Sequence, residues 1–143
     1  ELDFLKYDAL VLFNRFYNPD IDINELTMKS GNPLSTNTDY SEVLRWVGLM
    51  SEEINLDLCA NTGIHDGETL IKMILAGASA VEICSVLIGN GLDSVNLMLE
   101  KLNNWMENKH YNAIEEFKGI LAQEKMSDPT IWERTQYIKS LHI

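Results

Sequence analysis

Two short turns in the middle of the chain have the residue types needed to bind a phosphate group. Asn61-Thr62-Gly63 follows the apolar run Leu56–Ala60, and Cys84-Ser85 ends the run that begins at Ala80. Small, flexible residues let backbone N–H groups approach an anion, and a helix that begins after the turn adds the positive end of its dipole. Taken alone the signal is ambiguous, because a glycine after a strand is often only a turn residue.

The apolar pattern around these turns predicts an α/β protein. Strands are expected at Ala9–Phe13, Leu56–Ala60 and Ala80–Cys84. The continuous apolar run Ala9–Phe13 is typical of a parallel strand buried on both faces by helices on either side. Helices are expected where apolar residues recur three and four apart, over 41–53, 66–77, 92–106, 111–121 and 129–141. The order strand, helix, strand, helix, strand, helix predicts a parallel sheet, which places the two turns side by side at one edge.

A long polar segment, Asn18–Thr38, separates the first strand from the first helix. Its Asn-Pro-Asp and Ser-Gly-Asn-Pro clusters predict turns, and a short ribbon is expected within Asp20–Leu34. Long loops in compact domains are usually functional or disordered, and Ile21, Ile23, Leu26 and Met28 give this one apolar surface for packing. We therefore expect a functional loop.

Three strands cannot close a β/α barrel, and a lone three-stranded parallel sheet leaves both of its edges open. We therefore expect residues 1–143 to form a single partial-barrel domain, completed by a second copy or by a missing N-terminal part. The chain begins at Glu1 without an initiator Met, which also favours a C-terminal fragment of a longer chain.

Composition narrows the range of functions. The net charge of −11 argues against nucleic-acid binding, which depends largely on Lys and Arg. The chain has neither an apolar run of 18 residues nor a secretory signal, so we expect a cytosolic protein without membrane contact. Cys59 and Cys84 lie within apolar runs and are expected to be buried free thiols, and the three histidines lack the spacing of a metal site.

Three segments together resemble one flavoprotein family. They are Ala60–Gly67, Ile74–Ala78 and Val81–Leu87, and they are similar to the C-terminal FMN-binding segment of the dihydroorotate dehydrogenases. In that family one strand ends in Gly-Gly-Ile/Val, a helix ends in Gly-Ala, and the next strand ends in Gly-Thr or Gly-Ser. Upstream, Val11–Phe16 and Leu44-Arg45-Trp46 look closest to the branch labelled dihydroorotate dehydrogenase-like. The resemblance covers most of the chain in the same order.

The resemblance implies the last three strand–helix units of a (β/α)8 TIM barrel, with extra C-terminal helices. It implies an FMN-dependent oxidoreductase of pyrimidine biosynthesis that acts on a CH–CH bond of a small molecule, dihydroorotate or a related dihydropyrimidine. The FMN phosphate would be held by backbone amides of Thr62, Gly63, Cys84 and Ser85, with Asn61 just before the first pair. Asn14, with Arg15 beside it, would contact the substrate.

Two departures from the family pattern bear on the phosphate site. Thr62 and Cys84 each replace a glycine, which restricts the backbone but removes no N–H donor. The catalytic base and the lysine beside the flavin would come from earlier strands of the barrel, so no catalytic residue is assigned and this chain alone is expected to be inactive. Two alternatives stay open. One is another phosphate-binding barrel enzyme with Asp57 and Glu82 as its acid–base pair, and the other is a non-catalytic half-barrel that pairs with itself.

Overall fold

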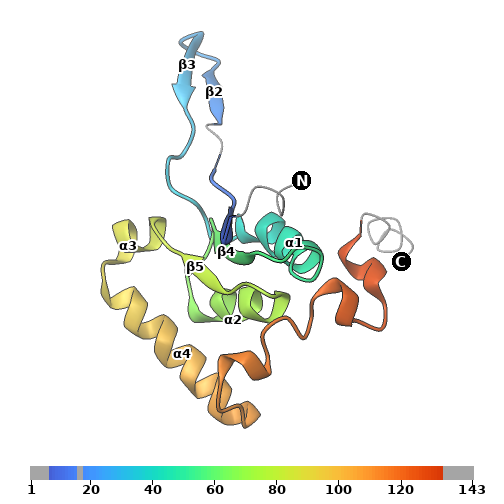
Figure 1. The fold of residues 1–143 in the computed structure, drawn as a ribbon. Helices are drawn as coiled ribbons and strands as arrows, with labels where there is room; N and C mark the ends of the chain where they lie inside the picture. Colours follow the sequence, from blue (N-terminus) through green and yellow to red (C-terminus); the bar gives the residue numbers. More distant parts are fainter. Residues whose placement is uncertain (1–6, 16–17, 134–143) are drawn as a thin grey trace, which may run out of the picture.

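A computed structural model describes residues 7–15 and 18–133 (Figure 1). The strands are β1 (Ala9–Leu12), β2 (Pro19–Asp22), β3 (Thr27–Ser30), β4 (Asp57–Asn61) and β5 (Ala80–Glu82). The helices are α1 (Tyr40–Met50), α2 (Gly67–Ala76), α3 (Ser85–Asn90) and α4 (Asp93–Lys109), followed by 3-10 turns at Ile114–Glu116, Gln123–Lys125 and Pro129–Trp132. In the described part of the chain no helix is long and apolar enough to cross a membrane.

The sheet is parallel and has the order β1-β4-β5, as the alternation of strands and helices predicts. Ala9 pairs with Asp57 and Leu12 with Ala60, while Asn61 at the end of β4 pairs with Glu82 at the end of β5. All three strands therefore end at the same edge, and the residues that follow them are neighbours.

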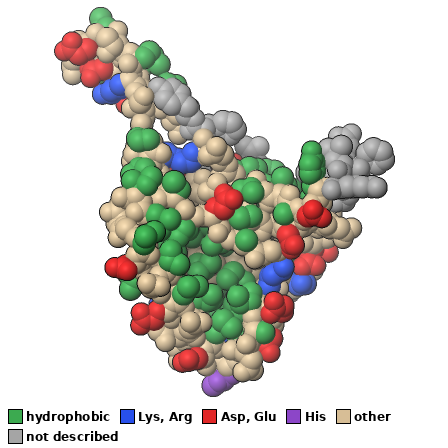
Figure 2. All heavy atoms as spheres, turned by 60° about the vertical axis from the view of Figure 1, so that its left-hand side comes forward, with side chains coloured by type: hydrophobic (Ala, Val, Ile, Leu, Met, Phe, Trp, Pro, Cys, Tyr) green, Lys and Arg blue, Asp and Glu red, His purple; other side chains and the backbone are tan. Residues whose placement is uncertain are grey.

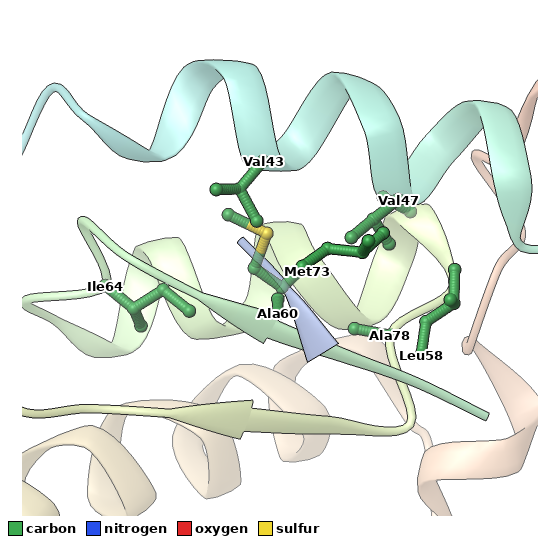
Figure 3. Close-up of a cluster of buried hydrophobic side chains, with 9 residues drawn as sticks. Val43, Val47, Leu58, Ala60, Ile64, Met73 and Ala78 are labelled. Atoms are coloured by element: carbon green, nitrogen blue, oxygen red, sulfur yellow. The ribbon is translucent and has the colours of Figure 1, made fainter. Parts of the chain in front are cut away.

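Both α1 and α2 cover the same face of this sheet. Val43 and Val47 of α1 point toward β4 and toward Met73 of α2 (Figure 3), and all three are buried in one cluster with Leu12, Leu58, Ala60, Ile64, Ala76 and Ala78. Parallel strands joined by right-handed crossovers in sequential order place their helices on one side, which accounts for this arrangement.

The opposite face of the sheet is not covered by any element within the described residues. Side chains alternate along a strand, so the residues between the buried ones point to this face. Val11 of β1 is 47% exposed, and Ala80 and Glu82 of β5 are also exposed. The expectation that the first strand is buried on both faces is therefore wrong, because in the described part of the chain the helices lie on one side of the sheet.

The expected ribbon in the long loop is confirmed as the antiparallel pair β2 and β3, which projects away from the body of the molecule (Figure 1). The expected helix over 111–121 is wrong. Instead, the segment contains a 3-10 turn, and the N–H groups of Gly119 and Leu121 donate to the carbonyls of Ile74 and Leu75 in α2. The expected helix over 129–141 begins as a 3-10 turn, and its part beyond residue 133 lies outside the described residues.

Both ends of α2 lie where the sequence predicts them. The Asp66 side chain caps the N-terminus by accepting a hydrogen bond from the N–H of Thr69 at 2.7 Å. Gly77 ends the helix at φ 117°, a left-handed conformation that favours glycine, and a Cβ atom there would lie 2.3 Å from Cβ of Ser51. The Ser51 hydroxyl also donates to the carbonyl of Ala76, so the end of α2 is packed directly against the residue that follows α1.

The substitution Gly77→Ala should destabilise the protein by about 2 kcal/mol or more, because the left-handed conformation alone costs roughly 1–2 kcal/mol and the added methyl group displaces Ser51. The matched control is Gly89→Ala in α3, where nothing lies within 4 Å of an added Cβ. Urea unfolding followed by circular dichroism measures both variants. Equal stability of the two would contradict the close packing of α1 against α2.

Candidate anion-binding site at the strand ends

The two turns line one small cavity at the carboxyl edge of the sheet. The cavity has a volume of about 160 Å³ and is lined by Asn14, Arg15, Pro33, Ser35, Asn61, Thr62, Gly63, Ile64, Glu82, Ile83, Cys84 and Ser85. All seven residues that the sequence singles out as cofactor or substrate contacts are among them. The structure thus brings these residues together, while their individual roles stay predictions.

The backbone of the first turn has left-handed conformations at two successive residues, with φ 89° at Thr62 and φ 76° at Gly63. Thr62 therefore takes a conformation in which glycine is usual, and its hydroxyl donates a 2.7 Å hydrogen bond to the carbonyl of Phe13, just past β1. At Gly63 a side chain has no room, because a Cβ atom would lie 2.2 Å from the backbone nitrogen of Tyr40. The turn is thus held between the end of β1 and the start of α1.

Ser35 connects the long loop to the residues after both strands. Its N–H donates to the Ser85 hydroxyl at 2.8 Å, and its own hydroxyl lies 2.9 Å from Nε2 of His65. Sequence reasoning missed Ser35 and Pro33, because no local motif marks them and the partners of Ser35 lie 30 and 50 positions away. The four apolar residues expected to pack this loop, Ile21, Ile23, Leu26 and Met28, are instead exposed, because the β2–β3 ribbon projects from the body of the molecule (Figure 1). A functional role of the loop stays a prediction.

One cation and one acid line the cavity. The Arg15 guanidinium donates from Nη1 to the carbonyl of Asn32 at 3.1 Å, and its Nε lies 3.7 Å from Oδ2 of Asp39. Glu82 is the acid. Asn14 and Arg15 also border a larger, open cavity of about 620 Å³ beside β1, which includes Trp46 and Asp39. Asn14 and Arg15 therefore lie between the two turns and the open edge of the sheet.

The two thiols are less buried than expected. Cys84 is exposed and Cys59 is half-buried, and both are free. Cys59 belongs to the set of side chains that point to the uncovered face, which explains why its apolar surroundings in the sequence do not bury it. Partial burial raises the pKa of the Cys59 thiol, and the nearby negative charge of Glu82 raises it further. Among the described residues, no group of three or more His, Cys, Asp or Glu side chains could hold a metal ion.

Several aromatic and acidic residues outside the small cavity have structural roles. Trp105 packs against Phe117 with ring centroids 5.0 Å apart, and Trp132 donates to the carbonyl of Leu121. Asp57 begins β4 and accepts a 2.6 Å hydrogen bond from Ser79, with Lys118 3.9 Å away. It therefore lies at the opposite end of the sheet from Glu82, which ends β5.

The chain consists of parallel β/α units, and its candidate site lies at the carboxyl ends of the strands. These two features place it in the class of parallel β/α proteins. In sequence it is similar to the catalytic subunit of dihydroorotate dehydrogenase B (NAD(+)) from two archaea. The chain is 29% identical to that of Thermoplasma acidophilum over 119 residues and 30% identical to that of Thermoplasma volcanium over 118 residues, covering 80% of this chain in each case. It is also 26% identical over 85 residues to a chloroplastic dihydropyrimidine dehydrogenase (NADP(+)) of Arabidopsis thaliana. No family model matches the chain.

The comparison with solved structures also finds a dihydroorotate dehydrogenase (DHODH). The ligand-free DHODH of Eimeria tenella matches with a TM-score of 0.56 and 25% identity over 60% of this chain and 24% of its own. The same enzyme in complex with ferulenol matches over 79% of this chain with a TM-score of 0.63; at 21% identity that match supports the fold alone. Together the comparisons show that the chain is similar to dihydroorotate dehydrogenases, as the sequence resemblance predicts. The chain spans 39% of the length of the two archaeal relatives.

The position of Glu82 predicts a change in thiol reactivity. In a Cys84→Ser background, Glu82→Gln should lower the pKa of Cys59, because one of the two causes that raise it is removed while partial burial remains. The pH at which iodoacetamide alkylation of Cys59 reaches half its maximal rate, followed by mass spectrometry, should therefore move down. The matched control, Glu53→Gln beyond the end of α1, should leave it unchanged. An unmoved midpoint in the Glu82 variant would contradict the proximity of the two side chains.

Proposed function

We propose that this chain supplies the phosphate end of the cofactor site in an FMN-dependent oxidoreductase of the dihydroorotate dehydrogenase type. The observation that carries the proposal is the single cavity shared by the turns after β4 and β5, with Gly63 held in a conformation and a space that exclude a side chain. Loops after the last strands of β/α barrels recurrently bind phosphate.

The residues present fit the phosphate of FMN. The cavity has a size suited to one phosphate group rather than to a whole flavin, and its walls are short side chains and backbone at Thr62, Gly63, Cys84 and Ser85. The absence of a side chain at Gly63 lets Tyr40 pack against the first turn, which fixes the conformation of that turn. Since Ser35 already engages the Ser85 hydroxyl, Ser85 would act through its backbone rather than its side chain.

When bound, FMN would supply the redox chemistry by accepting a hydride from a CH–CH bond of the substrate. The residues of this chain would bind and orient. Asn14 lies beside the turns and at the open edge of the sheet, so we assign it to the dihydropyrimidine substrate, dihydroorotate or a related ring. None of the described residues is assigned as the catalytic base, which we expect on a preceding strand, and this chain alone is then inactive.

We further propose that residues 1–143 are one part of a (β/α)8 barrel. All-parallel sheets occur almost only with both faces covered. In the proposed barrel, the face of the sheet that is uncovered in this chain would be the barrel interior. Beside β5 lies an apolar groove of about 410 Å³, lined by Leu70, Ile74, Ser79, Ala80, Val81, Ile83, Val95, Met98, Leu99, Leu102 and Ile114. Figure 2 shows hydrophobic side chains gathered on the side of the molecule where β5, α3 and α4 lie. The remaining β/α units, from an N-terminal part of the chain, would cover both surfaces.

One of the two alternatives loses support from the geometry. A phosphosugar isomerase or aldolase would need Asp57 and Glu82 as a pair, and these residues lie at opposite ends of the sheet. A half-barrel that pairs with itself would use the same groove as the proposed barrel. Its distinguishing property is a stable dimer of this chain in solution.

The chain should bind FMN weakly and show no turnover of dihydroorotate. Gly63→Ala should abolish the weak binding, because a methyl group there meets the backbone of Tyr40, whereas Gly89→Ala should preserve it. Quenching of flavin fluorescence measures binding, and circular dichroism checks that both variants fold. A chain that purifies with one FMN bound would contradict the partial site, and equal binding by the two variants would contradict the placement of the phosphate.

The groove beside β5 should bind the dye ANS, which fluoresces on exposed apolar surface. Leu99→Ser should reduce that fluorescence, because Leu99 is 49% exposed and lines the groove. Both the wild type and this variant should sediment as monomers. Ile131→Ser is the matched control, since Ile131 is equally exposed but outside the groove. A tight dimer that Leu99→Ser dissociates would support the self-pairing half-barrel instead.

A further inference from the structure

Arg15 is the one cationic side chain that lines the small cavity within the part of the chain that the structure describes. It shares this cavity with Thr62, Gly63, Cys84 and Ser85, the residues proposed to surround the phosphate. The sequence resemblance implies a contact between Arg15 and the substrate. The structure places Arg15 among the walls of this small cavity and also beside the larger cavity next to β1.

The loop between β3 and α1 holds the Arg15 side chain at two points. Nη1 donates to the carbonyl of Asn32, and Nε lies 3.7 Å from a carboxylate oxygen of Asp39. That same oxygen, Oδ2, accepts a 2.8 Å hydrogen bond from the N–H of Thr36, which fixes the carboxylate on the loop. A guanidinium has five N–H donors in a planar fork, so these two contacts leave donors for an anion.

The negative charges around the cavity indicate that a bound phosphate needs a cation beside it. The chain carries a net charge of −11, and Glu82 lines the same cavity. Backbone N–H groups orient a phosphate but bring no net charge, so an anion held by them alone would face repulsion from Glu82 and from the acidic chain. Arginine matches a phosphate with two parallel N–H···O bonds.

We propose that Arg15 binds the phosphate of the flavin nucleotide directly and that Asp39 positions it. The proposal rests on the proposed FMN site and assigns to it the charge that the two turns lack. It makes binding depend on the phosphate: FMN should bind more tightly than riboflavin, which has the same ring and no phosphate, and Arg15 should account for much of that difference.

The test compares wild type, Arg15→Met, Arg15→Lys and Lys29→Met by NMR titration of backbone amides, which measures weak binding and reports folding in the same spectra. The probes are FMN, riboflavin and inorganic phosphate. Lys29→Met is the matched loss of one positive charge, because Lys29 lies on β3, pairs with Asp22 and is outside the cavity.

For Arg15→Met we expect FMN and inorganic phosphate to bind about 10-fold more weakly or worse, as loss of a charge-assisted hydrogen bond implies. Riboflavin binding should be unchanged. Arg15→Lys should bind FMN with intermediate affinity, and Lys29→Met should lie within about twofold of wild type, as remote surface charges are screened.

Three results would overturn the assignment. Unchanged FMN affinity in Arg15→Met while wild type binds FMN would remove Arg15 from the phosphate and leave the proposed function standing. Equal losses of affinity for FMN and riboflavin in Arg15→Met would indicate that Arg15 contacts the flavin ring. Absence of any shift in wild type with either FMN or phosphate would reject the proposed site together with this inference. Should Arg15→Met not fold, Arg15→Lys carries the comparison, with the same ratio of FMN to riboflavin affinity as the readout.

Discussion

The right-handed crossover between parallel strands is the constraint on which the rest of this structure depends. It places α1 and α2 together on one face of the β1-β4-β5 sheet, and no helix of the described residues covers the other face. It also makes all three strands end at the same edge, so that residues 49 positions apart, Phe13 and Thr62, meet through a hydrogen bond. The shared cavity and the open sheet are thus two results of one topological rule.

The cavity itself is assembled by contacts between distant segments. Ser35 reaches both His65 and Ser85, and Asp39 and Asn32 hold Arg15, so the loop after β3 is tied to the ends of all three strands. Gly63 makes this possible because it lets Tyr40, at the start of α1, approach the first turn closely. Site and loop are therefore joined by direct contacts at the ends of all three strands.

Sequence reasoning succeeded where the physics is local. The bounds of α2 depend on a side-chain cap at Asp66 and a left-handed residue at Gly77, and both signals lie within the helix ends. It failed where partners are distant. Residues 111–121 have a helical pattern, yet Gly119 and Leu121 donate to carbonyls of α2, and Val11 is exposed because its sheet is covered on one side only. The turns could be found from residue types, whereas Ser35 could not, because its partners lie 30 and 50 positions away.

Completion of the barrel would change the strength of the site without changing its residues. In this chain the cavity borders an uncovered sheet face, and Arg15, with its side chain 25% exposed, is screened by solvent. An added layer of strands and helices would lower the local dielectric, and the same ion pair is worth several times more at the lower values found near or inside a protein. It would also raise the pKa of Cys59 further, because burial already raises it. The proposed weak binding by this chain is therefore compatible with the proposed phosphate contacts, since a completing layer would contribute the environment in which those contacts act.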